Sequence, residues 1–162
     1  MSPGPERRLV RKAVGYVVRD RRILVFTHDD VPLEVGGVQV PAGTIEPSET
    51  PDAAVVREVL EETGVMARVV ASLGVERYDV WPSKPEVHER HFFQLEPLDD
   101  SRDEQWSAGE CDPSDGGSAQ RWTCQWIDLE QAHVLCAGFG ARLGEISPQD
   151  ANSVDFRGPE GE

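Results

Sequence analysis

Apolar residues alternate with polar ones, or form short β-branched runs, over much of the chain, and both patterns are typical of strands. Residues 7–18 predict a first strand, 19–22 a polar turn, and 23–27 its hairpin partner. The same patterns predict further strands over these ranges: 38–40, 66–75, 87–95 and 121–127. Strands are therefore expected to dominate the front of the chain.

A helix with well-marked ends is predicted after the third strand. Thr50 can cap its first turn, Pro51 suits the first helical position, and Gly64 can adopt the left-handed conformation that ends a helix. Apolar residues at spacings of three and four predict a buried stripe made of Ala53, Val56, Leu60 and Thr63. The opposite side of this helix would then face solvent.

A second helix is predicted near the end of the chain. Asp128 can cap it, and apolar positions continue to about Ile146, although Gly138 and Gly140 weaken its middle. With strands dominating and helices interspersed, the chain predicts an α+β sandwich in which a mixed β-sheet lies between helices.

The length of 162 residues suits one domain. Residues 1–6 are expected to form a disordered lead, 7–146 the domain, and 147–162 a flexible tail without periodicity. Within the domain, residues 96–120 are acidic and rich in Gly, Ser and Pro, which predicts a long acidic loop.

The formal charge of −14 and the pI near 4.6 argue against general nucleic-acid binding and against binding to anionic membranes, both of which need a basic surface. No apolar run approaches the ~20 residues of a transmembrane helix. The three cysteines show no C-x-x-C pairing, so free thiols in a reducing cytoplasm are expected.

Three carboxylates stand close together on the exposed side of the first helix. Glu58, Glu61 and Glu62 occupy positions i, i+3 and i+4, which are neighbours on a helix surface, so their charges repel one another. A divalent cation such as Mg²⁺ would remove that repulsion and could also bridge to substrate phosphates. The alternative is a solvated acidic face without a function, because such runs are common in helices.

The residues around these carboxylates resemble the Nudix box, G-x5-E-x7-R-E-U-x-E-E-x-G-U, where U is a bulky aliphatic residue. Every fixed position from Gly43 to Val65 matches. The resemblance implies the Nudix fold, which is also the fold class predicted above, and metal-dependent hydrolysis of a phosphoanhydride bond.

The resemblance also implies roles for individual box residues. Glu58 and Glu62 match the principal ligands of Mg²⁺ or Mn²⁺, and Glu61 matches a further ligand or the general base. Glu49 matches the residue that orients Arg57.

A backbone carbonyl near the first glycine of the box often helps to hold the metal in this family, and that position falls on Ala42 or Gly43. In some family members the base comes from a loop outside the box. Glu104 and Glu110 are candidates here, and Glu110 is preferred because it lies near Trp106.

Substrate-binding candidates lie outside the box. The basic cluster at the front of the chain includes Arg11, which could reach a phosphate, or could serve only solubility. The aromatic-rich connection over 76–86 offers Tyr78 for stacking and Lys84 for a phosphate, or could simply cover the core. Arg90, on the same face of its strand as His88, completes the candidates.

The expected substrate is a nucleoside diphosphate linked to another group. ADP-ribose, nucleotide sugars, dinucleoside polyphosphates and (d)NTPs remain open, and the resemblance also admits a homodimer. Two other function classes compete with the enzyme: a Nudix-fold module that senses a nucleotide without cleaving it, and an interaction domain with a solvated acidic helix.

Overall fold

A computed structural model describes residues 6–29, 37–98, 104–110, 120–135 and 138–146 of the chain. Its helical segments are α2 (Pro51–Thr63) and two short 3₁₀ segments, η1 (Leu129–Val134) and η2 (Leu143–Glu145). Its strands are β1 (Arg8–Arg19), β2 (Arg22–His28), β3 (Ala42–Thr44), β4 (Ala67–Asp79), β5 (Glu86–Pro97), β6 (Gln105–Glu110) and β7 (Gln120–Asp128).

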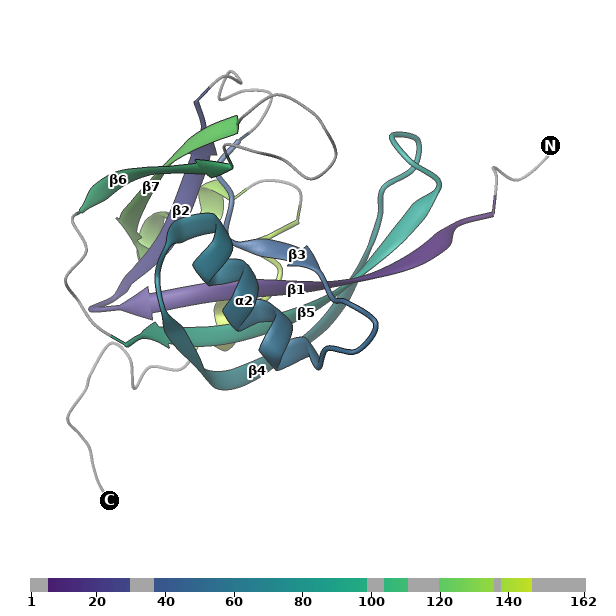
Figure 1. Ribbon diagram of the computed structural model, residues 1–162, viewed down its shortest axis with the longest axis horizontal. Helices are drawn as coiled ribbons and strands as arrows, with labels where there is room; N and C mark the ends of the chain where they lie inside the picture. Colours follow the sequence, from purple (N-terminus) through teal and green to yellow (C-terminus); the bar gives the residue numbers. More distant parts are fainter. Residues whose placement is uncertain (1–5, 30–36, 99–103, 111–119, 136–137, 147–162) are drawn as a thin grey trace.

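The described strands form a mixed sheet in the order β4-β5-β1-β2-β7-β6, with β3 paired to β1 (Figure 1). β1 runs parallel to β5, and the other pairs are antiparallel. Residues 12–14 of β1 pair with β3. The pairing of β1 with β2 is confined to the end of β1, at Val18 and Arg19. β1 therefore connects the two parts of the sheet.

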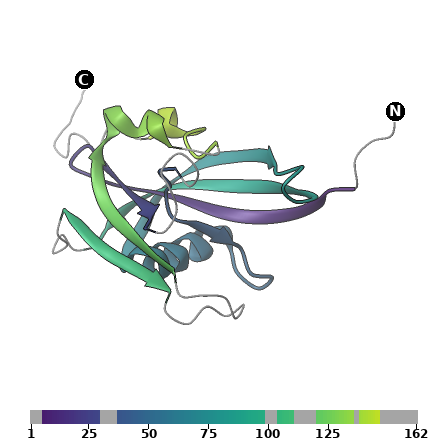
Figure 2. The ribbon, with the colours of Figure 1, turned by 90° about the horizontal axis from the view of Figure 1, so that it is seen from above.

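Helix α2 covers one face of the sheet, and the 3₁₀ segments cover the other (Figure 2). Each face has its own core. On the α2 side, apolar residues of α2 pack against those of β1, β5 and β7. Val59 of α2, Leu95 of β5 and Trp122 of β7 are examples. On the other side, Tyr16, Phe92 and Ala132 belong to the second core. The predicted α+β class with a mixed sheet is confirmed.

Helix α2 begins and ends where the sequence predicts. The Thr50 hydroxyl accepts a hydrogen bond from the N–H of Ala53 at 3.3 Å, and Gly64 ends the helix with a φ of 77°. The predicted buried stripe is wrong for Ala53 and Leu60, which are exposed. It is correct for Thr63, which is buried, while Val56 is partly buried against the core. The buried residues of the helix are Ala54, Val55, Val59 and Thr63.

Gly15 on β1 explains why α2 buries a different face from the predicted one. A Cβ at Gly15 would lie 3.0 Å from the Val55 side chain and 3.2 Å from that of Val59. Without a side chain at this position, the helix approaches β1 closely with those two valines inward. Leu60 then points to solvent, an outcome that spacing within the helix alone does not reveal.

Two stretches differ from the predicted loops. β4 runs to Asp79 and β5 begins at Glu86, so the connection predicted over 76–86 is shorter. The predicted loop over 96–120 contains strand β6, which pairs with β7 and lies at the edge of the sheet that the described strands form. Trp106 and Ala108 of β6 pack against the core, while its polar residues explain why the sequence reads as a loop.

The helix predicted from Asp128 to Ile146 is wrong in the parts that the structure describes. Those parts form the 3₁₀ segments η1 and η2, and Gly138 has a φ of 78°, which an α-helix does not accommodate. The apolar positions of the predicted helix still face the sheet: Leu129, Ala132, Leu135, Leu143 and Ile146.

Tyr16 anchors this C-terminal segment to the sheet. Its ring is fully buried, and its hydroxyl donates to the carbonyl of Phe139 and accepts from the N–H of Arg142, the latter at 3.2 Å. Burial raises the pKa of Tyr16 to about 12, so the phenol stays neutral and keeps its proton for donation.

Replacing Tyr16 with phenylalanine is expected to lower the free energy of unfolding by about 1–3 kcal/mol, because the Phe139 carbonyl and the Arg142 N–H lose their shared partner. Urea denaturation measures the change. Tyr78→Phe removes the same hydroxyl from an exposed residue and serves as the matched control. Equal stability of the two variants would contradict the anchoring role.

No helix in the described ranges is long and apolar enough to cross a membrane. Cys124 is buried in β7 and forms no disulfide, whereas Cys111 and Cys136 lie outside the described residues.

Candidate active site

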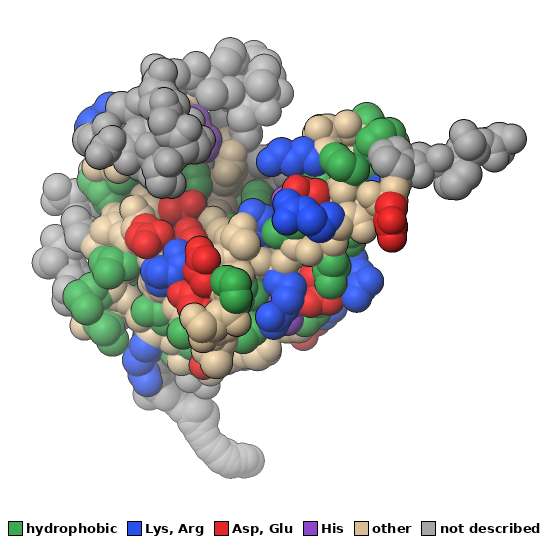
Figure 3. Space-filling model, turned by 45° about the vertical axis from the view of Figure 1, so that its right-hand side comes forward, with side chains coloured by type: hydrophobic (Ala, Val, Ile, Leu, Met, Phe, Trp, Pro, Cys, Tyr) green, Lys and Arg blue, Asp and Glu red, His purple; other side chains and the backbone are tan. Residues whose placement is uncertain are grey.

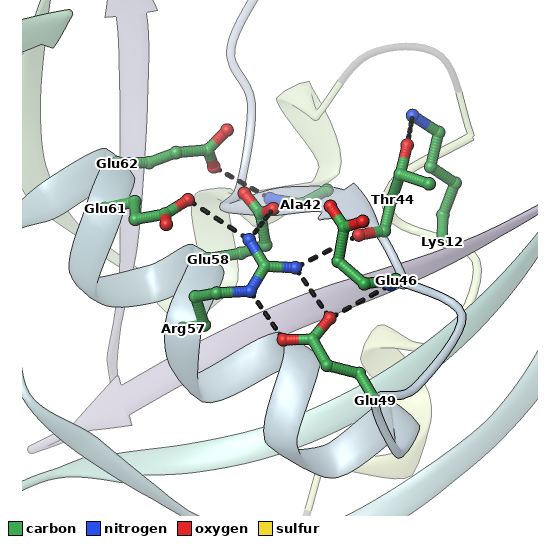
Figure 4. A network of polar contacts seen from close by, with 9 residues as sticks. All are labelled: Lys12, Ala42, Thr44, Glu46, Glu49, Arg57, Glu58, Glu61 and Glu62. Atoms are coloured by element: carbon green, nitrogen blue, oxygen red, sulfur yellow. Dashed lines mark hydrogen bonds and ion pairs between the residues drawn. The ribbon is translucent and has the colours of Figure 1, made fainter.

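Arg57 is the centre of the polar network on α2 (Figure 4). Its guanidinium donates two hydrogen bonds to the Glu49 carboxylate, from Nε at 2.6 Å and from Nη2 at 2.8 Å. Nη1 donates to Glu58 at 2.7 Å and to Glu61 at 3.2 Å, and Nη2 reaches the carbonyl of Thr44 at 3.1 Å. Arg57 thus ties the loop before the helix to two of the carboxylates on it.

Glu49 fixes the orientation of Arg57, which is the role that the sequence resemblance implied. The Arg57 hydrogen bonds, together with one from the N–H of Glu46 at 3.0 Å, lower the pKa of Glu49 to about 2. The Glu49 carboxylate in turn raises the pKa of Arg57. Both groups therefore stay charged over the whole physiological range.

Gly43 on β3 leaves room for the Glu58 carboxylate. A Cβ at Gly43 would overlap the carboxylate of Glu58, so this pair of positions admits only glycine with Glu58 in its present place. Burial raises the pKa of Glu58, and the Arg57 hydrogen bond counteracts part of that rise. The carboxylate sits in a space shaped by β3 and α2.

Glu62 lies on the next turn, where one of its oxygens accepts a hydrogen bond from the N–H of Ala42 at 2.9 Å. Burial, with the charges of Glu58 and Glu61 as smaller causes, raises the pKa of Glu62 to about 8. A carboxylate in this state carries charge only at a cost, unless a cation lies nearby.

Two tryptophans hold the C-terminal end of α2. The indole N–H of Trp122 donates to the carbonyl of Glu62 at 2.6 Å, and that of Trp106 donates to the carbonyl of Thr63 at 2.8 Å. These bonds satisfy carbonyls that a helix end leaves without partners. They also fix the turn that carries Glu61 and Glu62.

A cavity of about 560 Å³ opens above these side chains, and we call it the carboxylate cavity. It is lined by Glu46, Arg57, Glu58, Glu61, Glu62, Gly109 and Trp122. As they stand in the described structure, no three carboxylate, histidine or cysteine side chains converge on one point as metal ligands would. Arg57 lies between Glu58 and Glu61, and Glu62 turns toward Ala42.

The carboxylate cavity nevertheless fits a divalent cation. Glu58, Glu61 and Glu62 supply the oxygen ligands that Mg²⁺ and Mn²⁺ prefer, and the cavity has room for an ion with its waters. The Arg57 guanidinium already provides positive charge between Glu58 and Glu61. The raised pKa of Glu62 indicates that this charge does not neutralise the third carboxylate.

A second cavity, of about 180 Å³, is lined by Ala42 and Gly43 of β3, and we call it the basic cavity. Lys12, His88 and Arg90 contribute its charged and titratable groups, and Glu62 lines both cavities. The remaining lining residues are Phe26, Gln39, Val40 and Phe139. The register of β1 on β5 aligns Lys12 with Arg90, which brings the two cations together.

Arg90 is held between two aromatic rings. Its guanidinium carbon lies 4.3 Å from the ring centre of Tyr78 and 4.3 Å from that of Phe139, and the residue is only 5% exposed. Cation–π contacts of this kind fix the plane of the guanidinium. One face of the Tyr78 ring therefore contacts Arg90, and the stacking role expected for Tyr78 stays a prediction.

The four predicted substrate-binding residues lie in different places. Arg90 lines the basic cavity, and Tyr78 contacts it through Arg90. Lys84 is exposed in the turn before β5, and its charge acts on Lys12. Arg11 is exposed and 3.7 Å from Glu89, and it does not line the basic cavity.

Of the two predicted base candidates outside the box, Glu104 contacts Arg22. Glu110 ends β6, one residue after Gly109 of the carboxylate cavity, and its side chain lies outside the described residues. The face in Figure 3 shows acidic side chains gathered on the body of the molecule, with Lys and Arg side chains on the projecting ends of β1, β4 and β5 beside them.

Sequence reasoning did not single out Lys12, Gln39 or Phe139 as lining residues. A usable signal for Lys12 is its parity with Val14 and Tyr16, which places all three on the same face of β1. Phe139 lies in the stretch predicted as helix, so its position could not be derived from that prediction.

Comparison with known proteins supports one family. The model of the NUDIX domain matches residues 9–149. The ADP-ribose pyrophosphatase of Methanocaldococcus jannaschii is 39% identical over 61 residues, 38% of this chain and 36% of that protein. The RNA pyrophosphohydrolase of Erythrobacter litoralis is 33% identical over 96 residues, 51% of this chain and 58% of that protein. The matched regions thus span about a third to three fifths of these relatives' lengths.

Solved structures share the fold. A NUDIX hydrolase from Nitrosomonas europaea superposes with a TM-score of 0.61 at 17% identity, over 85% of this chain and 87% of that one. The E. coli ORF135 protein superposes with a TM-score of 0.60 at 20% identity, over 94% of this chain and 100% of that one. At such identities the likeness concerns the fold alone.

Proposed function

Because this chain belongs to the NUDIX family, we propose that it is a metal-dependent hydrolase that cleaves the diphosphate of a nucleoside diphosphate linked to another group. The observation that carries the proposal is the Arg57 network, which connects Glu49, Glu58 and Glu61 beside the carboxylate cavity. A solvated acidic helix would need neither this network nor a glycine against one of its carboxylates.

Mg²⁺ or Mn²⁺ would be held by Glu58 and Glu62, with Glu61 and the backbone at Gly43 as further donors. When bound, such an ion neutralises charge on the diphosphate and lowers the pKa of a coordinated water. To bind the cation, the Glu58 and Glu61 carboxylates would contact both the ion and Arg57. The Glu62 carboxylate would turn from the Ala42 N–H toward the cavity.

The residues of the chain itself perform three tasks in this proposal. Arg57, fixed by Glu49, keeps Glu58 and Glu61 in place and offsets their mutual repulsion. Gly43 keeps the space for Glu58. Glu61, whose side chain is 58% exposed at the cavity, can accept the proton as water attacks phosphorus, with Glu110 as the alternative base.

The natural substrate is proposed to be a small molecule in a reducing cytoplasm, where Cys124 stays a free thiol. The net charge of −14 disfavours long nucleic acids, so we expect diphosphate derivatives of single nucleosides or dinucleosides.

The deciding experiment is a hydrolysis screen with and without Mg²⁺ or Mn²⁺, with product identification. Its substrates are ADP-ribose, nucleotide sugars, dinucleoside polyphosphates and (d)NTPs. Metal-dependent release of a nucleotide from at least one class supports the proposal. Tight binding without any cleavage would instead indicate a sensing module, and neither binding nor cleavage would indicate an interaction domain.

Stabilisation by Mg²⁺ is expected to grow as the pH rises from 6 to 8.5. In the metal-free protein the pKa of Glu62 is about 8, against 4.5 for an ordinary glutamate, so between these values the native state holds a proton that the unfolded state has lost. This group therefore favours the native state less as the pH rises toward 8. A cation that binds the ionised form competes with that proton, and below pH 8 its apparent affinity falls by up to tenfold per unit.

Thermal unfolding with and without Mg²⁺ at each pH measures this effect. The matched control is Glu62→Gln, which cannot titrate and should show a Mg²⁺ shift that changes much less with pH. A shift in the unmodified protein that is the same at pH 6 and pH 8.5 would contradict the involvement of Glu62.

A further inference from the structure

We infer that the basic cavity binds a second anionic group of the substrate, at least one phosphate in addition to the diphosphate that is cleaved. The inference rests on the proposed function and narrows its substrate class. Lys12 and Arg90 would be the residues that determine specificity.

The first argument is the local excess of positive charge. In a chain with a net charge of −14, Lys12 and Arg90 line one small cavity, and Lys84 lies close enough for its charge to act on Lys12. Burial is the largest cause that lowers the pKa of Lys12, and the charges of Lys84 and Arg90 lower it further. The charges of Glu86 and Glu58 offset only part of this lowering. An arrangement of like charges that destabilises its own members is relieved by an anion.

The neighbouring carboxylates are engaged with other residues. Glu86 accepts hydrogen bonds from Arg8 at 2.8 Å and pairs with His88 at 3.0 Å. Glu58 accepts from Arg57. The hydrogen bond of Lys12 goes to the neutral hydroxyl of Thr44 at 2.9 Å, and the charges of Glu86 and Glu58 act on Lys12 only through space.

Arg90 is arranged to bind without reorganising. The rings of Tyr78 and Phe139 fix its guanidinium, and Gly138 allows this close approach, since a Cβ there would lie 3.3 Å from both Arg90 Nη1 and the Tyr78 ring. A guanidinium held in one plane loses little entropy when it binds a phosphate. One face of the Phe139 ring is taken by Arg90, which disfavours stacking of a nucleobase there.

The position of the basic cavity connects it to the proposed reaction. Ala42, Gly43 and Glu62 line it, and Glu62 also lines the carboxylate cavity. A substrate whose diphosphate lies at the carboxylate cavity can therefore extend past Glu62 into the basic cavity. Glu62 is the opposing charge in this space, and the cation proposed for the carboxylates would neutralise it.

The test compares substrates that differ by a phosphate. ATP against ADP-glucose places the additional phosphate in line with the diphosphate, and NADPH against NADH places it on a sugar. We expect wild-type protein with Mg²⁺ to prefer the phosphate-bearing member of at least one pair. The pair that shows this preference then identifies where the additional phosphate is attached, in line with the diphosphate or on a sugar.

Lys12→Met and Arg90→Met are expected to lower that preference in kcat/KM by roughly tenfold or more, mainly through KM, because each removes a charged donor to the ligand. The matched control is Arg68→Met, which removes one positive charge from an exposed pair with Glu96 at the other end of β4 and should leave the preference unchanged. A folding defect would instead lower turnover of both members of a pair.

The inference fails while the proposed function stands if wild-type protein hydrolyses substrates without preferring the phosphate-bearing member, or if variants that unfold at the same urea concentration as the wild type lose turnover of both members equally. If no substrate is cleaved, the proposed function fails, and metal-free calorimetry with inorganic tripolyphosphate decides the inference. Binding that weakens in Lys12→Met but not in Arg68→Met supports it, and equal or absent binding overturns it.

Discussion

Glu62→Gln is expected to lower kcat for the best substrate by roughly 10²–10⁴-fold, because a carboxylate that would hold the cation is replaced by a neutral amide. A bound metal contributes several kcal/mol of transition-state stabilisation, and each 1.36 kcal/mol corresponds to a factor of ten in rate. Glu58→Gln should have an effect of similar size. Initial rates at saturating substrate across a Mg²⁺ titration measure both variants.

Stability separates this effect from unfolding. Since burial raises the pKa of Glu62 to about 8, the neutral amide should leave the metal-free protein at least as stable as the wild type at pH 8. Glu145→Gln, on the exposed η2 segment, removes the same charge far from the network and serves as the control. Near-full Mg²⁺-dependent hydrolysis by Glu58→Gln would show that the ligand assignment is wrong.

Gly43→Ala is expected to reduce kcat/KM by roughly 100-fold while changing the free energy of unfolding by about 1 kcal/mol or less. The added methyl group would overlap the Glu58 carboxylate, and that carboxylate, at the end of a flexible side chain, can swing aside at little cost to the fold. Displacement of a catalytic group by about 1 Å can cost on the order of 10²-fold in rate. Kinetics and urea denaturation on the same sample measure the two effects.

Gly144→Ala adds the same methyl group where no atom lies within 4 Å of it, so activity and stability should both stay near the wild-type values. If Gly43→Ala were fully active, the position of Glu58 against β3 would have no part in the reaction. If it were inactive and also unfolded, the loss would report on β3 rather than on Glu58.

Local signals in the sequence predict the two ends of α2 well. Thr50, Pro51 and Gly64 define the helix through caps that depend only on nearby residues. Glu49 and Arg57 are eight positions apart across the helix start, and the family resemblance was needed to pair them. The face of the helix was misassigned because it depends on Gly15, which is distant in sequence.

The errors elsewhere have the same origin in distant contacts. β6 is a strand because β7 supplies its hydrogen bonds, and its own polar residues give no such indication. The C-terminal segment packs through apolar residues at helix-like spacing, but its glycines and the Tyr16 hydroxyl hold it in 3₁₀ turns. The basic cavity exists because the parallel register of β1 on β5 aligns Lys12 with Arg90, and composition does not reveal a register.

The tryptophans at the end of α2 give the protein an intrinsic fluorescent probe. Trp122 lines the carboxylate cavity while its indole N–H donates to the carbonyl of Glu62, so the electric field at this chromophore depends on the charges around that glutamate. Emission therefore provides a label-free titration of cation or nucleotide occupancy. Trp106, hydrogen-bonded to the neighbouring Thr63 carbonyl, is a second emitter at this helix end, and Trp122→Phe would separate the Trp122 signal from that of the other three tryptophans.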